Sequence, residues 1–288
     1  MTFLSLLWQG NAWRGAPWPA MIAPPTEAAP MLFRDLPDGS WLAVSQPMHA
    51  LVSGQMLRAW GAPGFARPEP FEEVATACAQ HDVAWMGWES CPTLDYTTGR
   101  PPSFRMLGAR IHAPMWGDGV RRAVAAWGPW AGLLISRHGT RIYADYQDRH
   151  RMDRRDVDAA DAYLKEQAGV RQELMRLAGA TEADVETGGA LVAVTDALSL
   201  AACGGLATIG WSPMAPLEDG GAAALKLDQG EDAIIVSPWP FALPEVRLSW
   251  TARRFAPGTR WTDEVAMRAD FARAPFQAVA LRLVPGRG

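Results

Sequence analysis

The chain has 288 residues, a formal net charge of −4, 49% hydrophobic residues and 20% charged residues. This balance lets a chain bury a core, so it excludes a mostly disordered protein. The negative charge does not favour nucleic acid or an anionic membrane as a partner. No apolar run approaches the roughly 18 residues that would span a bilayer. The three cysteines form no CxxC pair, which disfavours disulfide and zinc–thiolate frameworks, and we expect a cytoplasmic protein.

Residues 1–30 are rich in tryptophan and proline and show neither helical nor strand periodicity. We expect an irregular extension there, or an incorrectly assigned translation start, with Met31 opening the folded part. A β-hairpin is predicted over 31–46, because Asp38-Gly39 separates two apolar stretches and glycine accepts the positive φ of such turns.

Helical spacing of apolar residues dominates the next part of the chain. The first helix follows Ser45 and Pro47 and runs to Trp60, since proline is tolerated in a first helical turn. A long loop is predicted over 90–114 because it contains four prolines. The other predicted helices cover 71–82, 115–127, 129–138, 151–180 and 190–203.

After the last of these helices the pattern changes to strand-like alternation, at 233–237, 245–250 and 276–284. These patterns predict a mainly α protein with a smaller β-rich part. The predicted domains are a helical domain over 31–205, opened by the hairpin, and a β-rich region over 206–288 that can pack on 31–46.

Histidines and aspartates on the predicted helices are the candidate metal ligands. They are His49, the pair His81-Asp82, and Asp196 in the middle of an apolar helix, with His138 at the end of another. Imidazole and carboxylate suit Fe, Mn, Zn or Mg without any thiolate, and helical bundles gather such ligands from facing helices. A buried carboxylate also needs a partner, and a divalent metal is one.

From Met31 onward the sequence resembles an uncharacterised bacterial family, the domain-of-unknown-function family numbered 3891. The segments that carry the resemblance are QPMH (46–49), HDVAWMGWE (81–89), PTLD (92–95), GRPPSF (99–104), LLISRHG (133–139), TDALSLAAC (195–203) and PWPF (238–241). This resemblance covers nearly the whole chain apart from 1–30, but it implies no activity.

The order His … His-Asp … Asp on successive helices also resembles the HD superfamily of metal-dependent phosphohydrolases. That resemblance implies an HD-like helical bundle in which His49, His81, Asp82 and Asp196 hold one metal. His138 is then an extra ligand, as in two-metal members. Many hydrolases of the superfamily have a lysine shortly after the His-Asp pair, whereas this chain has 84–86 AWM there, which puts phosphoester hydrolysis in question.

Other readings of these ligand candidates stay open. His49 can be a helix histidine bonded to a neighbour, and His138 can be favoured by a helix C-terminus. Asp196 can instead fix a loop by accepting backbone N–H groups.

Four further residues are site candidates. Glu89 can orient a ligand histidine or pair with an arginine, either Arg100 or Arg105. Arg100 can clamp a substrate anion or be a solvated loop residue. Trp85 and Trp88 can stack on a substrate ring or belong to the core.

We expect a metal-dependent hydrolase that cleaves a phosphoester or a related bond, with His138 and Glu89 as catalytic residues. Its substrate is expected to be a small molecule, which can be anionic, bound by Arg100, Trp85 and Trp88. A di-iron oxygenase acting on a small polar molecule and a non-catalytic binding protein are the alternatives. The sequence names no oligomeric state, and we expect neither a nucleic acid nor a membrane as partner.

Overall fold

The computed structural model describes residues 31–103, 107–144, 153–209 and 211–286. Of these residues 52% are helical and 21% lie in strands or bridges. The fold is therefore mixed α/β, and the prediction of a mainly α, HD-like bundle is wrong. The predicted extension over 1–30 falls outside the described residues.

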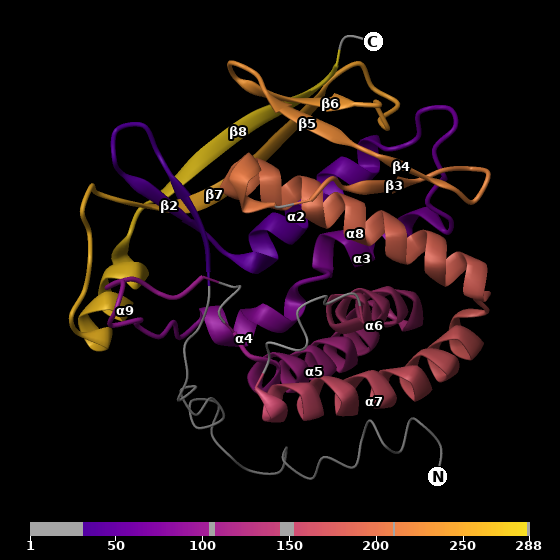
Figure 1. Ribbon diagram of the computed structural model, residues 1–288, viewed down its shortest axis with the longest axis horizontal. Helices are drawn as coiled ribbons and strands as arrows, with labels where there is room; N and C mark the ends of the chain where they lie inside the picture. Colours follow the sequence, from indigo (N-terminus) through magenta and orange to yellow (C-terminus); the bar gives the residue numbers. More distant parts are fainter. Residues whose placement is uncertain (1–30, 104–106, 145–152, 210, 287–288) are drawn as a thin grey trace.

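A six-stranded sheet brings together the first and last parts of the described chain (Figure 1). In order of pairing, its strands are β1 (Leu32–Asp35), β2 (Trp41–Val44), β7 (Val246–Phe255), β8 (Phe276–Pro285), β6 (Ala233–Ser237) and β5 (Lys226–Gln229). β2 runs antiparallel to β7, with Trp41 opposite Phe255. A second sheet pairs β3 (Met214–Pro216) with β4 (Ala222–Ala224).

Local chemistry explains the hairpin but not its place in this sheet. Gly39 has a φ of +79°, and Asp38 accepts the backbone N–H of Ser40 at 3.0 Å, so the turn forms as its sequence predicts. The partner of β2, however, lies about 200 residues later in the chain. Alternating side chains indicate a strand without identifying the strand beside it, so the sequence predicts that the later strands can pack on the hairpin but not that β2 pairs with β7 in one six-stranded sheet.

The helices begin and end at identifiable signals. Ser45 caps α2 (Gln46–Ala59) by accepting the Met48 N–H, and Pro47 lies in its first turn. Thr181 and Asp184 form a reciprocal cap at the start of α8 (Glu182–Gly204). The remaining helices are α3 (Phe71–Gln80), η3 (Val83–Trp85), α4 (Met86–Glu89), α5 (Ala109–Trp127), α6 (Pro129–Ala144), α7 (Arg154–Ala178), η6 (Leu206–Thr208) and α9 (Glu264–Arg273).

The loop predicted over 90–114 is shorter in the structure, because α5 already begins at Ala109 and contains Pro114. A proline inside a helix removes one hydrogen bond, here to the carbonyl of Arg110, without ending the helix. His112, which the sequence places near a turn, is consequently a buried helical residue.

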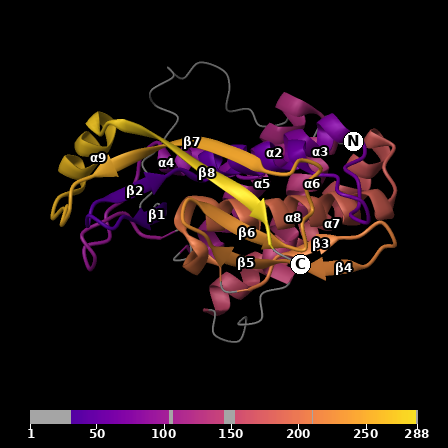
Figure 2. The same cartoon turned by 90° about the horizontal axis from the view of Figure 1, so that it is seen from above.

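Helices α2 and α8 lie between the sheet and the remaining large helices (Figure 1). Seen from above, β7 and β8 run over the helices and α9 covers one end (Figure 2). By length and composition α8 alone among the described helices could cross a membrane, but 72% of its apolar window is buried inside the fold. It is a core helix, packed against α2, α6 and β3.

Candidate metal centre

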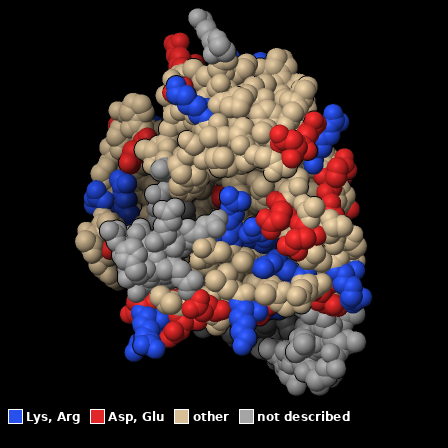
Figure 3. Space-filling view, turned by 45° about the vertical axis from the view of Figure 1, so that its right-hand side comes forward, with Lys and Arg blue, Asp and Glu red and all other residues tan. Residues whose placement is uncertain are grey.

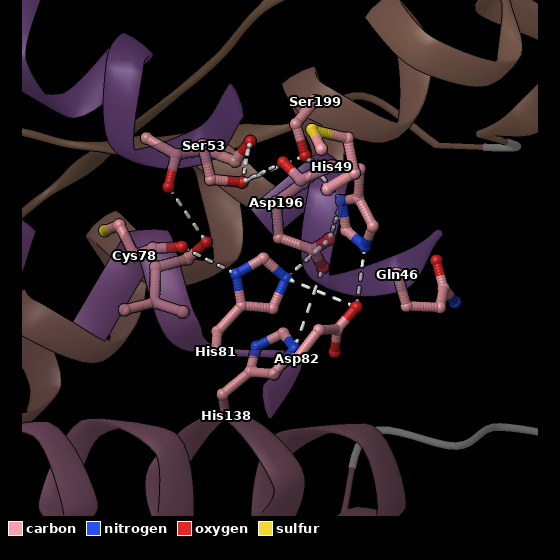
Figure 4. Close-up of polar contacts among 12 residues, drawn as sticks. Gln46, His49, Ser53, Cys78, His81, Asp82, His138, Asp196 and Ser199 are labelled. Carbon is pink, nitrogen blue, oxygen red and sulfur yellow. Dashed lines mark hydrogen bonds and ion pairs between the residues drawn. The ribbon is translucent and has the colours of Figure 1, made fainter. Parts of the chain in front are cut away.

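Five ionisable side chains converge from four helical segments (Figure 4). His49 comes from α2, His138 from α6 and Asp196 from α8, while His81 and Asp82 directly follow α3. The structure thus brings together the four ligand candidates and His138.

The end of α3 explains how two adjacent residues face one space. His81, the residue that caps the C-terminus of α3, keeps helical dihedral angles, whereas Asp82 departs from them, with φ −101° and ψ 20°. Neighbours within a helix would point about 100° apart. The break in the helix removes that constraint and lets both side chains reach the cluster.

The distances within the cluster are short. His49 Nε2 lies 2.6 Å from Asp82 Oδ2, and His81 Nε2 lies 3.4 Å from Asp196 Oδ1 and 3.7 Å from Asp82 Oδ2. His138 Nε2 is 3.8 Å from Asp196 Oδ2.

Two overlapping groups have ligand atoms within 4.8 Å of one another: His49, His81 and Asp82, and His81, His138 and Asp196. Donors bound to one ion at 2.0–2.2 Å can be separated by at most about 4.4 Å, so small side-chain movements suffice for a shared ion.

A shell of hydrogen bonds fixes two of the imidazoles. His81 Nδ1 donates to the carbonyl of Cys78 at 2.8 Å, which leaves Nε2 directed at the two carboxylates. His49 Nδ1 lies 2.8 Å from Ser199 Oγ, and that hydroxyl donates to the carbonyl of Asp196. His49 Nδ1 is then the donor of this pair. Such outer partners set the tautomer of metal-binding histidines.

This arrangement means that the His49–Asp82 contact requires a positive charge. With the ring proton on Nδ1, the lone pair of Nε2 faces a carboxylate oxygen at 2.6 Å. Two acceptors repel at that distance unless a positive charge lies between or beside them. Either a second ring proton on His49 or a bound metal cation would supply this positive charge.

Polar atoms without partners point to the same conclusion. Among the described residues, His81 Nε2, His138 Nδ1 and Gln46 Oε1 are buried and have no hydrogen-bond partner. Buried polar groups are nearly always paired in native proteins. The cluster therefore has binding capacity that the chain itself does not use.

The charges of the cluster favour a cation. Burial alone would raise the pKa of Asp196, but the neighbouring His81, whose Nε2 lies 3.4 Å away, lowers it to about 2. Burial likewise opposes the charged form of His81, yet Asp82 and Asp196 raise its pKa to about 9. Both carboxylates thus keep their charge, since the neighbouring histidines also lower the pKa of Asp82, and buried carboxylates beside imidazoles are the donor set that a divalent ion needs.

His138 behaves differently from His81. Burial lowers the pKa of His138 to about 4, so its imidazole is neutral at pH 7 and free to donate a lone pair. The Asp196 side chain is 18% exposed, against 0% to 7% for the other four, and it marks the side from which solvent reaches the cluster.

Among the described residues, which do not include Arg105, no hydrogen bond or ion pair joins Glu89 to a histidine side chain or to Arg100. Both of its carboxylate oxygens accept the backbone N–H of Gln46, at 2.8 and 3.0 Å. Burial raises the pKa of Glu89 well above its usual range, which favours a protonated carboxyl. Gln46 starts α2, so Glu89 anchors the helix that carries His49.

The three predicted substrate residues have different surroundings. Trp85 is buried with its ring 5.1 Å from that of His112, while Trp88 is half-buried on α4. Arg100 lies over the ring of Trp41 and 3.5 Å from Asp35. Among the described residues, no hydrogen bond or ion pair joins Arg100 to the five clustered side chains.

Sequence reasoning missed Ser199, Gln46 and the buried His112, the last of which has no hydrogen bond or ion pair with the cluster among the described residues. Ser199 and Gln46 each lie three positions from a ligand candidate, a helical spacing that would have identified them. His112 is missed because the sequence places Pro114 in a loop. It accepts the Trp116 indole N–H and donates from Nδ1 to Tyr143 at 2.6 Å, and Trp116 packs on His138.

The surface around the helices shows no separation of charge on the face in Figure 3, where basic and acidic side chains of the described residues lie next to one another. Bidentate pairs such as Arg137–Glu186, with both contacts at 2.8 Å, are typical of this mixture.

Comparison with family models gives one match, described as "Protein of unknown function (DUF3891)", over residues 31–256. Comparisons with curated proteins and with solved structures give no match. The matched segment contains all five clustered side chains and extends from β1 to the end of β7. Because it covers well over half of the chain, the protein belongs to the DUF3891 family.

Proposed function

We propose that the protein is a metal-dependent hydrolase with an HD-type metal centre. His49, His81, Asp82 and Asp196 hold a divalent cation, and His138 is a further ligand. The observation that carries this proposal is the convergence of three imidazoles and two carboxylates in two overlapping groups, each with its ligand atoms within 4.8 Å of one another. A divalent cation would supply a Lewis acid and lower the pKa of water at this position.

The chain's own groups fit the remaining tasks of hydrolysis. Glu89, whose burial favours the protonated carboxyl, is proposed to give its proton to the leaving group. His138, neutral at pH 7, fits a ligand or a proton acceptor better than a proton donor. A small anionic substrate would enter past Asp196, and we propose that the protein acts in a reducing compartment such as the cytoplasm, since its three cysteines are free.

Metal content tests the proposal. Elemental analysis of protein purified without a histidine tag should give close to one ion or more per chain, and the same metal should raise the melting temperature. The variant His81→Ala should lose both effects. His112→Gln is the matched control, because it replaces a buried histidine that lacks a contact with either carboxylate.

Each result has a defined meaning. Zn, Mn or Mg with hydrolysis of a phosphoester supports the proposal. Bound iron with an iron-dependent oxidation redirects it to oxygenase chemistry, which needs the same nitrogen and oxygen ligands. Metal retention by His81→Ala equal to that of the control removes the site, and an absence of bound metal leaves a non-catalytic binding protein.

A further inference from the structure

Unlike the other two imidazoles of the cluster, His138 has no hydrogen bond within the described part of the chain that orients its ring. The outer nitrogens of His49 and His81 lie 2.8 Å from the Ser199 hydroxyl and from the Cys78 carbonyl. His138 Nδ1 is buried and has no partner among the described residues. Metal-binding histidines almost always have such a partner, which fixes the direction of the ring. Packing therefore has to hold the His138 ring in place.

The indole of Trp116 supplies this packing. Its ring centroid lies 5.4 Å from that of His138, with an angle of 49° between the rings. Trp116 is 1% exposed and belongs to α5, whereas His138 belongs to α6. Gly139, the residue after His138, makes room for the indole, because a Cβ there would come within 3.0 Å of it. The position of the His138 ring thus depends on the position of this indole.

A chain of two hydrogen bonds anchors the indole in turn. His112 lies four residues before Trp116, so the two side chains share a face of α5. An indole nitrogen can only donate, and the Trp116 N–H donates to His112 Nε2. An imidazole that accepts at Nε2 carries its proton on Nδ1, which donates to the Tyr143 hydroxyl at 2.6 Å. Since Tyr143 lies on α6, the indole is tied to both helices.

We propose, resting on the proposed function, that Trp116 is a positioning residue of the metal centre. It holds the His138 ring so that Nε2 faces the cluster, where Asp196 Oδ2 lies 3.8 Å away. Packing here replaces the outer hydrogen bond that the other two histidines have. Loss of an outer partner typically lowers metal affinity about 10- to 100-fold. Trp116→Phe loses the N–H that anchors the ring, so it should weaken metal binding about tenfold.

A double-mutant cycle tests whether Trp116 acts through His138, because the effect must then disappear once the imidazole is removed. Competition with a chelator measures the Zn²⁺ affinity of the full chain. Trp116→Phe should lower this affinity about tenfold in the wild-type chain and less than about twofold in the His138→Ala chain. The matched control is Trp60→Phe, which also loses a buried indole hydrogen bond, here to the Ala66 carbonyl. It should change the affinity less than about twofold.

The outcomes separate this inference from the proposed function. A similar loss in both backgrounds would indicate general damage to the fold and overturn the inference, as would no loss in either or no effect of His138→Ala alone. A wild-type chain that binds no zinc would contradict the proposed function itself.

A second measurement needs no variant. In the zinc-loaded wild-type chain, nuclear magnetic resonance of ¹⁵N-labelled histidine and tryptophan should show a scalar coupling across the N–H···N bond between Trp116 and His112. A missing coupling would show that the indole is not anchored and would overturn the inference even if Trp116→Phe fails to fold.

Discussion

His49 Nε2 and Asp82 Oδ2 lie 2.6 Å apart, although His49 belongs to α2 and Asp82 is the second residue after α3. Asp82→Asn keeps the shape of this contact and removes its charge. We expect metal affinity to fall by at least about 100-fold, beyond the range for outer-shell changes. Competition with a chelator measures it. An affinity within about threefold of wild type would exclude Asp82 as a ligand.

A variant of Ser199 tests whether the hydrogen-bond partner of His49 affects metal affinity. Its hydroxyl is the partner of His49 Nδ1, so Ser199→Ala should lower metal affinity about 10- to 100-fold while the chain stays folded. Ser136→Ala is the control, because that equally buried hydroxyl donates to Gln167 and not to the cluster. If both variants bind metal alike, the His49–Ser199 contact has only a packing role.

His112 predicts how stability depends on pH. Burial lowers its pKa to about 3, from 6.5. Between pH 6.5 and 3, His112 therefore binds a proton in the unfolded chain but not in the folded chain. As a result, the free energy of unfolding falls as the pH falls through this range, by up to about 1.4 kcal/mol per pH unit.

His112→Gln should remove that dependence. The variant is expected to be less stable than wild type at pH 8, because contacts with Tyr143 and Trp116 are weakened, and the difference should shrink steadily toward pH 4. Urea unfolding of metal-free protein at several pH values measures it. A difference that stays constant with pH would show that His112 is not held neutral.

A variant of Gly139 tests the close packing around Trp116, the residue that contacts His138. A Cβ there would overlap the hydroxyl of Tyr163 and come within 3.0 Å of Trp116, the indole that packs on His138. Gly139→Ala should destabilise the protein by about 1–3 kcal/mol despite the better helix propensity of alanine.

Gly169→Ala is the comparison within a helix. No atom lies within 4 Å of a Cβ built at Gly169 on α7, so the same change should stabilise by up to about 1 kcal/mol. Thermal unfolding of both variants checks the opposite signs. Two changes of the same sign would contradict the close approach of Tyr163 to Gly139.

The convergence of the cluster could be anticipated because its members follow helical signals in the sequence. Apolar spacing and caps place His49, His138 and Asp196 within helices, and the His-Asp pair marks the end of α3. The details that decide the chemistry could not be anticipated. That His49 Nδ1 faces Ser199 of α8, or that Gln46 Oε1 is left without a partner among the described residues, depends on packing between helices far apart in the chain.

The sheet was anticipated only in part for a related reason. A strand was predicted at 245–250 and packing on the hairpin was expected, but nothing local shows that the strand extends to Phe255 or that β7 pairs with both the hairpin and β8. Arg100 illustrates the same limit: its residue type suits an anion, but the structure places it over Trp41.

The antiparallel pairing of β2 with β7 also constrains how the protein is made. During synthesis the hairpin leaves the ribosome long before Val246 is added. The edge of β2 that pairs with β7 therefore stays without its strand partner until then. The same delay applies to α2, whose Gln55 is bonded to the backbone of Ser249. Contacts of such long sequence separation slow folding, so α2, and with it His49, reaches its final position only after nearly all of the polypeptide has been translated.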